Sequence, residues 1–197
     1  MAEVITKTYM EKTPVINQCD IFRNVEFIEY VKESANTIEV SKIVFPLAMV
    51  LTQACDLQQD YNARKRNEID KAGTQDKFLI SVIVAPIYNF EEFRLGTHLD
   101  QLGLMMEPKG RRNKSLCENI IKNENKRYHY LNFDEDVEIV ESVIDFKHYF
   151  TVTINYLNNI RRSNYVCSID SLYREAIVQR FSNFLSRIGL PDPIDNM

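Results

Sequence analysis

The sequence contains no tryptophan, and its 197 residues include only five glycines, six prolines, four cysteines and three histidines. It has no glycine-rich phosphate loop, no GxSxG nucleophile elbow, no HExxH motif and no internal repeat. The cysteines, at positions 19, 55, 117 and 167, form no CxxC pair. Nothing in their spacing indicates a zinc site or a dithiol redox centre, so we expect free thiols.

The few histidines also bear on metal binding. His98 and His148 have no acidic or thiol residue at ligand spacing, so the sequence predicts no metal site. We likewise expect no cofactor.

Long apolar runs are missing as well. No segment approaches the roughly 20 apolar residues of a membrane span, and the first residues, MAEVITKTYMEKTP, lack the basic and apolar regions of a secretory signal. These features predict a cytoplasmic protein that does not bind a membrane.

Excess positive charge is also absent. The net charge is −4, so nucleic acid would be attracted only by a local basic patch. ARKR at 63–66 and KGRRNK at 109–114 are two such patches. Each fits a solvated face or a phosphate-binding surface, and the lack of interleaved aromatics favours the solvated face.

The residues that are present suit an ordinary globular protein. Apolar residues make up 45% of the chain and charged residues 26%, enough apolar material for a sizeable core. The length predicts a single domain over residues 1–197.

Strand patterns cover much of the chain up to residue 157. Residues 18–31 alternate apolar and polar side chains, as expected of a strand near a sheet edge. KIVFPLAMVLTQ and KFLISVIVAPIYNF are nearly unbroken apolar runs, which predict strands covered on both faces, the second ending at Pro86. Pro46 is expected at a strand start or a bulge. RYHYLNF, VEIVESVIDF and HYFTVTINYL are three further β-rich segments.

Two insertions and a C-terminal helix interrupt and close this pattern. Residues 58–76 predict a polar, mostly exposed helix, and residues 89–126 a series of short pieces separated by glycines. Residues 170–188 carry an apolar helical stripe with Asp170 or Ser168 as its N-cap. The fold predicted is mainly β with α insertions (α+β): a curved antiparallel barrel over residues 18–157 and a packed amphipathic helix.

The order CDIFRNVEF, FPLAMVLTQACDL and ISVIVAPI resembles the first strands of the PemK and MazF plasmid toxins, over residues 18–57 and 78–88. The resemblance implies an SH3-like barrel and metal-independent cleavage of single-stranded RNA, with Thr52 at the position of the Ser or Thr after the family's VL strand. YREAIVQRFSNFLSRIGLP resembles instead the end of bacterial proteins that pair a VLTQACDL-type strand with such a helix.

Candidate site residues follow the most buried strand. In TQACDL, Thr52, Cys55 and Asp56 leave the strand end together, where the backbone direction is fixed. Cys55 has the chemistry of a nucleophile, with His129 as its base and Arg127 on the same strand face. The alternative stays open that Cys55 is a small buried residue, Asp56 an N-cap and His129 a structural histidine.

Two classes of function therefore remain. The first is a binding or regulatory module of a bacterial toxin–antitoxin or phage-defence system, whose partner is a sensor protein, an antitoxin or a second copy of the chain. The second is a metal-independent endoribonuclease with RNA as substrate. The incomplete catalytic set favours the binding module.

Overall fold

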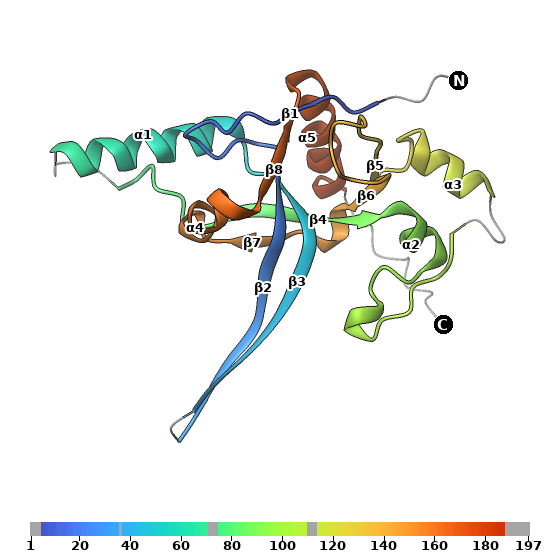
Figure 1. The fold of residues 1–197 in the computed structure, drawn as a ribbon, viewed down its shortest axis with the longest axis horizontal. Helices are drawn as coiled ribbons and strands as arrows, with labels where there is room; N and C mark the ends of the chain where they lie inside the picture. Colours follow the sequence, from blue (N-terminus) through green and yellow to red (C-terminus); the bar gives the residue numbers. More distant parts are fainter. Residues whose placement is uncertain (1–4, 36, 71–74, 110–113, 188–197) are drawn as a thin grey trace, which may run out of the picture.

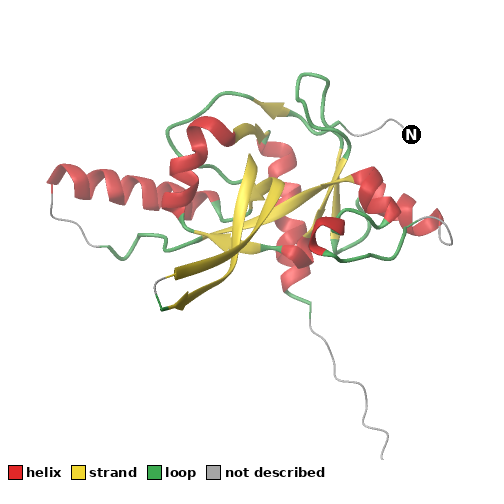
Figure 2. Cartoon of the chain, turned by 60° about the horizontal axis from the view of Figure 1, so that its bottom comes forward, coloured by secondary structure: helices red, strands yellow, loops and turns green. Residues whose placement is uncertain are grey.

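The computed structural model describes residues 5–35, 37–70, 75–109 and 114–187. The strands of this part of the chain form one curled, half-barrel sheet in the order β1-β8-β2-β3-β4-β6-β5, with β7 paired to β4 (Figures 1 and 2). Every strand pair is antiparallel, so the predicted α+β protein with a curved antiparallel sheet is confirmed at this level. The strand bounds are Thr8–Tyr9 (β1), Asp20–Ser34 (β2), Thr37–Val50 (β3), Val82–Asn89 (β4), Tyr128–Leu131 (β5), Ser142–Asp145 (β6), Phe150–Val152 (β7) and Tyr165–Ile169 (β8).

The central strands are buried on both faces, as their unbroken apolar runs predict. Ala48 and Val50 of β3 belong to one core cluster, and Met49 between them belongs to the other. The same alternation separates Phe22 from Ile21 in β2. Successive side chains of a strand point to opposite faces, so the sheet divides the core into two layers.

Helices supply the outer side of each layer. The bounds are Ala54–Asp70 (α1), Phe90–Leu95 (α2), Lys114–Ile121 (α3), Ile154–Asn164 (α4) and Ser171–Leu185 (α5). Ile177 and Phe181 of α5 pack in the layer of Met49, whereas Leu157 of α4 and Phe93 of α2 pack in the layer of Phe22.

Both strand prolines lie inside strands, so the prediction that the second strand ends at Pro86 is wrong. β7 pairs with β4 over Val82–Val84, and β6 pairs with β4 over Ile87–Asn89. Pro86 sits where the partner changes, a position at which no ladder N–H is required. Pro46 lies opposite Asn24 of β2, whose φ of +51° marks a local irregularity in the β2–β3 ladder.

The insertions match their predicted character. The helix α1 is polar and largely exposed, but it begins at Ala54, before the predicted insertion and before Asp56. Asp56 therefore lies in the first helical turn, where its charge favours the helix dipole, and the N-cap interpretation is wrong. The second insertion forms α2, a short 3₁₀ turn at Asp100–Leu102 and α3. Gly96 and Gly103 end the first two pieces in the left-handed conformation.

Two elements near the end of the sheet differ from the prediction or were missed. The segment 148–157 is a strand only over Phe150–Val152; Thr153 then caps α4 by accepting a hydrogen bond from the Tyr156 N–H. The strand β8 follows α4 directly and pairs with both β1 and β2.

The C-terminal helix begins where predicted. The Asp170 carboxylate accepts a hydrogen bond from the Leu172 N–H and caps α5. Only part of the predicted stripe is buried: Ile177, Phe181 and Phe184 are buried, whereas Leu172 is exposed. The helix ends at Leu185, and Ile188 of the predicted stripe lies outside the described residues.

The distal halves of β2 and β3 leave the body as a long two-stranded arm (Figures 1 and 2). We define the arm as residues 26–35 and 37–44. β3 pairs with β4 over Ala48–Val50, and from Leu47 to the tip its only strand partner in the described part of the chain is β2. Phe27 and Ile43 at its base still pack against the body. Beyond them, the arm is an extension of the sheet that no other described element covers.

Candidate functional site

The sequence-predicted cluster at the end of β3 has local contacts. The Thr52 hydroxyl accepts a hydrogen bond from the Ile83 N–H at 2.7 Å and so continues the β3–β4 ladder by one step. Cys55 is exposed, and its Sγ lies 3.6 Å from Oε1 of Gln53 and from Oδ1 of Asp56. These contacts organise the transition from strand to helix.

His129 and Arg127 lie in different surroundings from this cluster. His129 is 7% exposed and contacts the ring of Phe146. Burial, with a smaller contribution from the Arg180 charge, lowers the pKa of His129 to about 3. The imidazole is therefore neutral and closed off from solvent at physiological pH.

The structure does not join the two predicted groups. Within the described ranges, no hydrogen bond or ion pair connects Thr52, Cys55 or Asp56 with Arg127 or His129. The hypothesis that these side chains share one site gains no support from the geometry.

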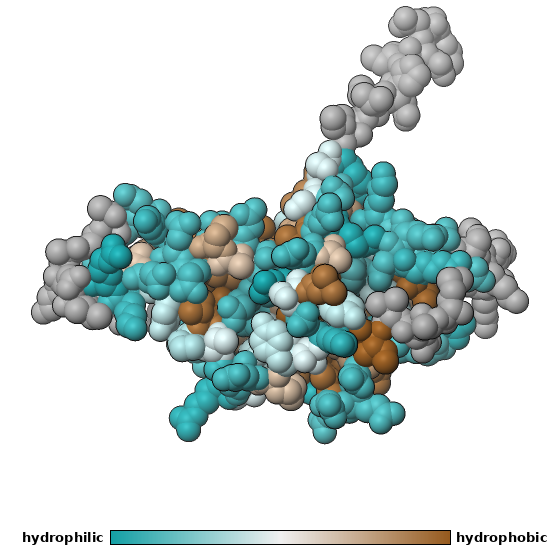
Figure 3. Space-filling model, turned by 90° about the horizontal axis from the view of Figure 1, so that it is seen from above, coloured by the Kyte–Doolittle hydropathy of each residue, from teal (hydrophilic) through white to brown (hydrophobic). Residues whose placement is uncertain are grey.

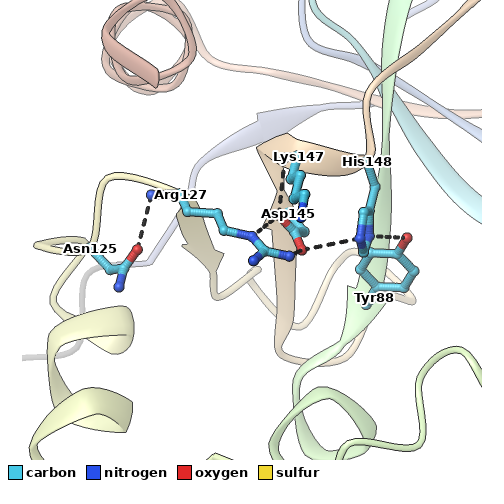
Figure 4. Close-up of polar contacts among 6 residues, drawn as sticks. All are labelled: Tyr88, Asn125, Arg127, Asp145, Lys147 and His148. Atoms are coloured by element: carbon cyan, nitrogen blue, oxygen red, sulfur yellow. Dashed lines mark hydrogen bonds and ion pairs between the residues drawn. The ribbon is translucent and has the colours of Figure 1, made fainter. Parts of the chain in front are cut away.

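Arg127 instead belongs to a polar cluster of four residues, which we call the Arg–Asp–His–Tyr cluster (Figure 4). Its guanidinium donates to both carboxylate oxygens of Asp145, at 2.8 and 2.5 Å. Nε2 of His148 lies 3.5 Å from Oδ2 of Asp145, and Nδ1 of His148 lies 3.0 Å from the Tyr88 hydroxyl. These contacts link the four side chains in one continuous polar network that runs from the start of β5 to β4.

Local structure sets this geometry. Asp145 ends β6 and caps the 3₁₀ turn Phe146–His148 by accepting a hydrogen bond from the Lys147 N–H. One such turn brings a residue three positions later back toward the cap, which places His148 beside Asp145. Tyr88 reaches the same point from β4, the strand next to β6.

The protonation states follow from the surroundings. Burial lowers the pKa of His148, and the Asp145 charge opposes that shift only in part. Burial also raises the pKa of Tyr88, whereas the hydrogen bond to Asp145 raises the pKa of Arg127. At neutral pH the Tyr88 hydroxyl therefore donates to Nδ1 of a neutral His148, whose Nε2–H is directed at Asp145.

Tyr88 connects the cluster with a cleft of about 320 Å³ that opens where β3 leaves β4. Its ring packs against His98 with the ring centroids 4.8 Å apart. Apolar side chains from three parts of the chain line the cleft, among them Phe45, Leu102 and Val140. The cleft is thus mostly apolar, and Tyr88 is the residue that it shares with the Arg–Asp–His–Tyr cluster.

The charged groups of the cleft are all of one sign. Glu92 and Glu138 line it, and none of its lining residues is a lysine or arginine. The remaining ionisable base is His98, and burial lowers its pKa. The cleft therefore favours an occupant that carries positive charge.

Sequence reasoning missed Tyr88, Asp145 and His148. It considered acidic neighbours of His148 only as metal ligands, whereas Asp145 lies 3.5 Å from its imidazole in a hydrogen-bonded cluster. The available signal was the spacing D-x-x-H in DFKH, which places a carboxylate three residues before the histidine. That spacing brings the two side chains together only in a helical turn, whereas the segment had been expected to be β-rich. Tyr88 is 57 positions before Asp145 and gave no local signal.

Comparison with protein-family models, with curated proteins and with solved structures found no match. The fold and site define a mixed α+β protein with a curled antiparallel sheet, a projecting arm and an acidic cleft at the base of that arm. In the described ranges, no set of three or more metal-ligating side chains is grouped to hold an ion. None of the described helices has the length and apolar character needed to cross a membrane.

Proposed function

We propose that this protein is a binding module for a polypeptide partner, and that the arm and the cleft at its base form the binding surface. The observation that carries the proposal is a row of five exposed apolar side chains along one face of the arm. Their exposed fractions run from 41% to 70%. The row consists of Val44, Ile28, Val40, Val31 and Ile38.

The strand register places these five side chains on one face. Val31 pairs with Val40, and the next pair on the same face toward the tip is Glu33 with Ile38. A β-bulge between Ile28 and Tyr30 adds one residue to β2. Because of that extra residue, Ile28 lies on the same face as Val31.

Exposure of this kind is unusual where no partner covers it. Clusters of exposed apolar side chains on monomers mark interaction sites, and here the ion pair of Lys42 with Glu26 lies on the same face as the apolar row. Covering the remaining exposed area of each side chain contributes about 1 kcal/mol, so the row supplies several kcal/mol to association. The face of the body seen from above, away from the arm, is mostly hydrophilic with small apolar patches (Figure 3).

The row is continuous with the cleft. Val44 belongs to both, because it is the first residue of the row and also lines the cleft. A partner that covers the arm therefore reaches the acidic cleft without leaving the surface.

The cellular setting is also part of the proposal. The likeness of residues 18–57 and 78–88 to the PemK and MazF toxins supports an SH3-like ancestry for the sheet. It also supports a role in a bacterial toxin–antitoxin or phage-defence system. The partner would then be a sensor protein or an antitoxin.

Paired variants test the role of the arm. Val31→Glu with Val40→Glu places two charges in the apolar row, whereas Tyr30→Glu with Ser41→Glu places two charges at the adjacent pair on the opposite face. Each double variant, tagged and expressed in cells that naturally make the protein, is compared with the wild type for quantitative recovery of partners. We expect the first to lose a partner that the second retains. Equal recovery by both would reject the row as the binding surface.

A metal-independent endoribonuclease is the second candidate function. The partly exposed His148, held between Tyr88 and Asp145 beside Arg127, is the observation that favours it. A neutral imidazole next to a cationic guanidinium suits acid–base chemistry on a phosphodiester. Expression of the wild type in a bacterial host should then arrest growth and cleave RNA, and His148→Asn should abolish both effects. Normal growth with intact RNA would remove this candidate.

A further inference from the structure

We infer that the cleft binds an extended polypeptide segment carrying lysine or arginine, which adds as a new strand to the free edge of β3. This inference rests on the proposed function, because it names the kind of partner segment that the module holds. It is carried by two features of the cleft: an unpaired strand edge and an acidic lining.

The edge is free along most of β3. Ala48, Met49 and Val50 pair with β4, and residues 37–47 have β2 as their only described strand partner. β4 continues to Asn89 but diverges from β3 and pairs there with β6. The cleft occupies the space between the two diverging strands.

Hydrogen bonds at the end of β3 indicate which backbone groups face the cleft. The Val50 carbonyl accepts from the Cys19 N–H on the β2 side, and the Leu51 N–H donates to the Ile83 carbonyl on the β4 side. Backbone groups of successive strand residues alternate in direction. The N–H and C=O groups of Leu47 are therefore directed away from β2 and toward the cleft. The alternation shifts at Pro46, because the Glu26 N–H donates to the Tyr156 hydroxyl and is thus directed away from β3. Val44, which pairs with Glu26, therefore also directs its N–H and C=O groups away from β2 and toward the cleft.

These groups are what an added strand requires. An extended peptide that pairs with a sheet edge obtains its affinity from main-chain hydrogen bonds and its specificity from alternate side chains. Leu47 and Val44 supply donors and acceptors on either side of Pro46, which has no N–H of its own. Apolar side chains around them, including Leu102 and Val140, provide contacts for the occupant's side chains.

The negative charge of the cleft favours an occupant that carries lysine or arginine. Glu92 forms no ion pair with any described residue, and Glu138 is 4.0 Å from Arg23 and almost fully exposed. With no lysine or arginine in the lining, two carboxylates meet the incoming strand. A segment that alternates apolar residues with lysine or arginine complements both the edge and the charge.

Defined peptides test the inference on the full-length protein. The probe is an acetylated, amidated hexapeptide that alternates valine and lysine, and its affinity is measured by calorimetry or fluorescence titration. A matched valine–glutamate hexapeptide reports the contribution of charge. A valine–lysine hexapeptide with alternate N-methylated amides reports strand pairing, because it cannot donate those hydrogen bonds.

We expect saturable binding of the valine–lysine peptide and at least tenfold weaker binding of both controls. Glu92→Gln with Glu138→Gln should weaken its binding by about three- to tenfold, as expected for the loss of two exposed ion pairs. The remote pair Glu11→Gln with Glu175→Gln should leave it unchanged. Equal binding of the lysine and glutamate peptides, or no binding of either, would overturn the inference.

Two further results separate this inference from the proposed function. Val31→Glu with Val40→Glu tests the proposed function separately, because these residues belong to the row on the arm and do not line the cleft. If that variant loses its cellular partner while the hexapeptide never binds, the proposed function stands and the inference fails. Sedimentation analysis could instead show a dimer that substitutions at the β3 edge abolish. That result would identify a second copy of the chain as the occupant and would also overturn the inference.

Discussion

At the scale of single residues, two buried carboxylates differ in how their charge is balanced. Asp145 is 1% exposed, and the Arg127 guanidinium contacts both of its oxygens. Asp20 is fully buried and accepts a hydrogen bond from the Asn17 N–H, but its Oδ1 has no partner among the described residues. The Asp145 carboxylate therefore depends on the Arg127 guanidinium for its charge balance, whereas burial makes the Asp20 carboxyl harder to ionise.

The Arg127–Asp145 pair predicts an unequal response to loss of either partner. Arg127→Gln leaves the buried Asp145 charge uncompensated and should lower the free energy of unfolding by about 3 to 5 kcal/mol. Asp145→Asn leaves the arginine, which is 28% exposed and partly hydrated, and should cost only about 1 to 2 kcal/mol. Urea unfolding of the two variants measures the difference, with the exposed Arg94→Gln as control. A larger loss of unfolding free energy for Asp145→Asn than for Arg127→Gln would show that Arg127 does not stabilise the buried Asp145 charge.

Asp20 predicts a pH dependence of stability. Burial raises its pKa from 3.8 to about 6 in the folded state. Between these values the folded state binds more protons than the unfolded state, so stability falls as pH rises from about 4 to about 6. The full contribution is roughly 3 kcal/mol.

The measurement is the difference in unfolding free energy between wild type and Asp20→Asn across this pH range. His129, whose pKa is lowered to about 3, acts in the opposite direction but contributes equally to both proteins. The wild type should lose stability relative to the variant as pH rises. A constant difference between the two proteins would contradict the assignment.

At the scale of elements, local chemistry explains which predictions succeeded. The prediction of α5 from its apolar stripe and its Asp170 cap held because both signals lie within one segment. The buried strands around Met49 and Ala85 were likewise recognisable from continuous apolar runs. By contrast, α4 was not predicted, because its segment begins with β-branched residues that favour a strand. The signals for the helix, the Thr153 cap and the burial of Leu157, depend on the neighbouring sheet.

Two glycines at the ends of short helical pieces form a matched pair. Both have positive φ, +83° at Gly96 and +69° at Gly103. A Cβ at Gly96 would lie 2.1 Å from the Met106 carbonyl oxygen, whereas at Gly103 it would meet nothing within 4 Å. Gly103→Ala should cost about 1 kcal/mol for the left-handed conformation alone, and Gly96→Ala clearly more. Thermal or urea unfolding would compare them, and equal costs would show that the Met106 segment moves away freely.

The helix α5 predicts a contrast between its buried and exposed apolar residues. Phe181 contacts the rings of Phe146 and Tyr149, each with ring centroids 5.5 Å apart. Phe181→Ala should therefore lower the unfolding free energy by about 3 to 5 kcal/mol. Leu172 is 75% exposed, and Leu172→Ala should change it by less than about 0.5 kcal/mol. A loss under about 1 kcal/mol for Phe181→Ala would mean that α5 does not hold this layer of the core.

At the scale of the whole molecule, the site was the part least accessible from sequence. The cleft arises where β3 and β4 diverge, and its walls come from segments around positions 45, 88, 98 and 140. No local pattern joins such distant segments. The row on the arm depends on a bulge that changes the side-chain alternation between Ile28 and Tyr30. The proposed site therefore depends on strand pairing, whereas the predicted one followed a single motif, TQACDL.

Backbone hydrogen exchange can show whether the arm and the cleft hold a polypeptide partner. The protein is isolated with the partner that the Val31→Glu/Val40→Glu variant loses, and its exchange is compared with that of the free chain. Outward-facing amides of β3, those of Val44 and Leu47 among them, should gain protection together with the arm and the segment around Leu102. Protection confined to other surfaces, with β3 unchanged, would contradict the account.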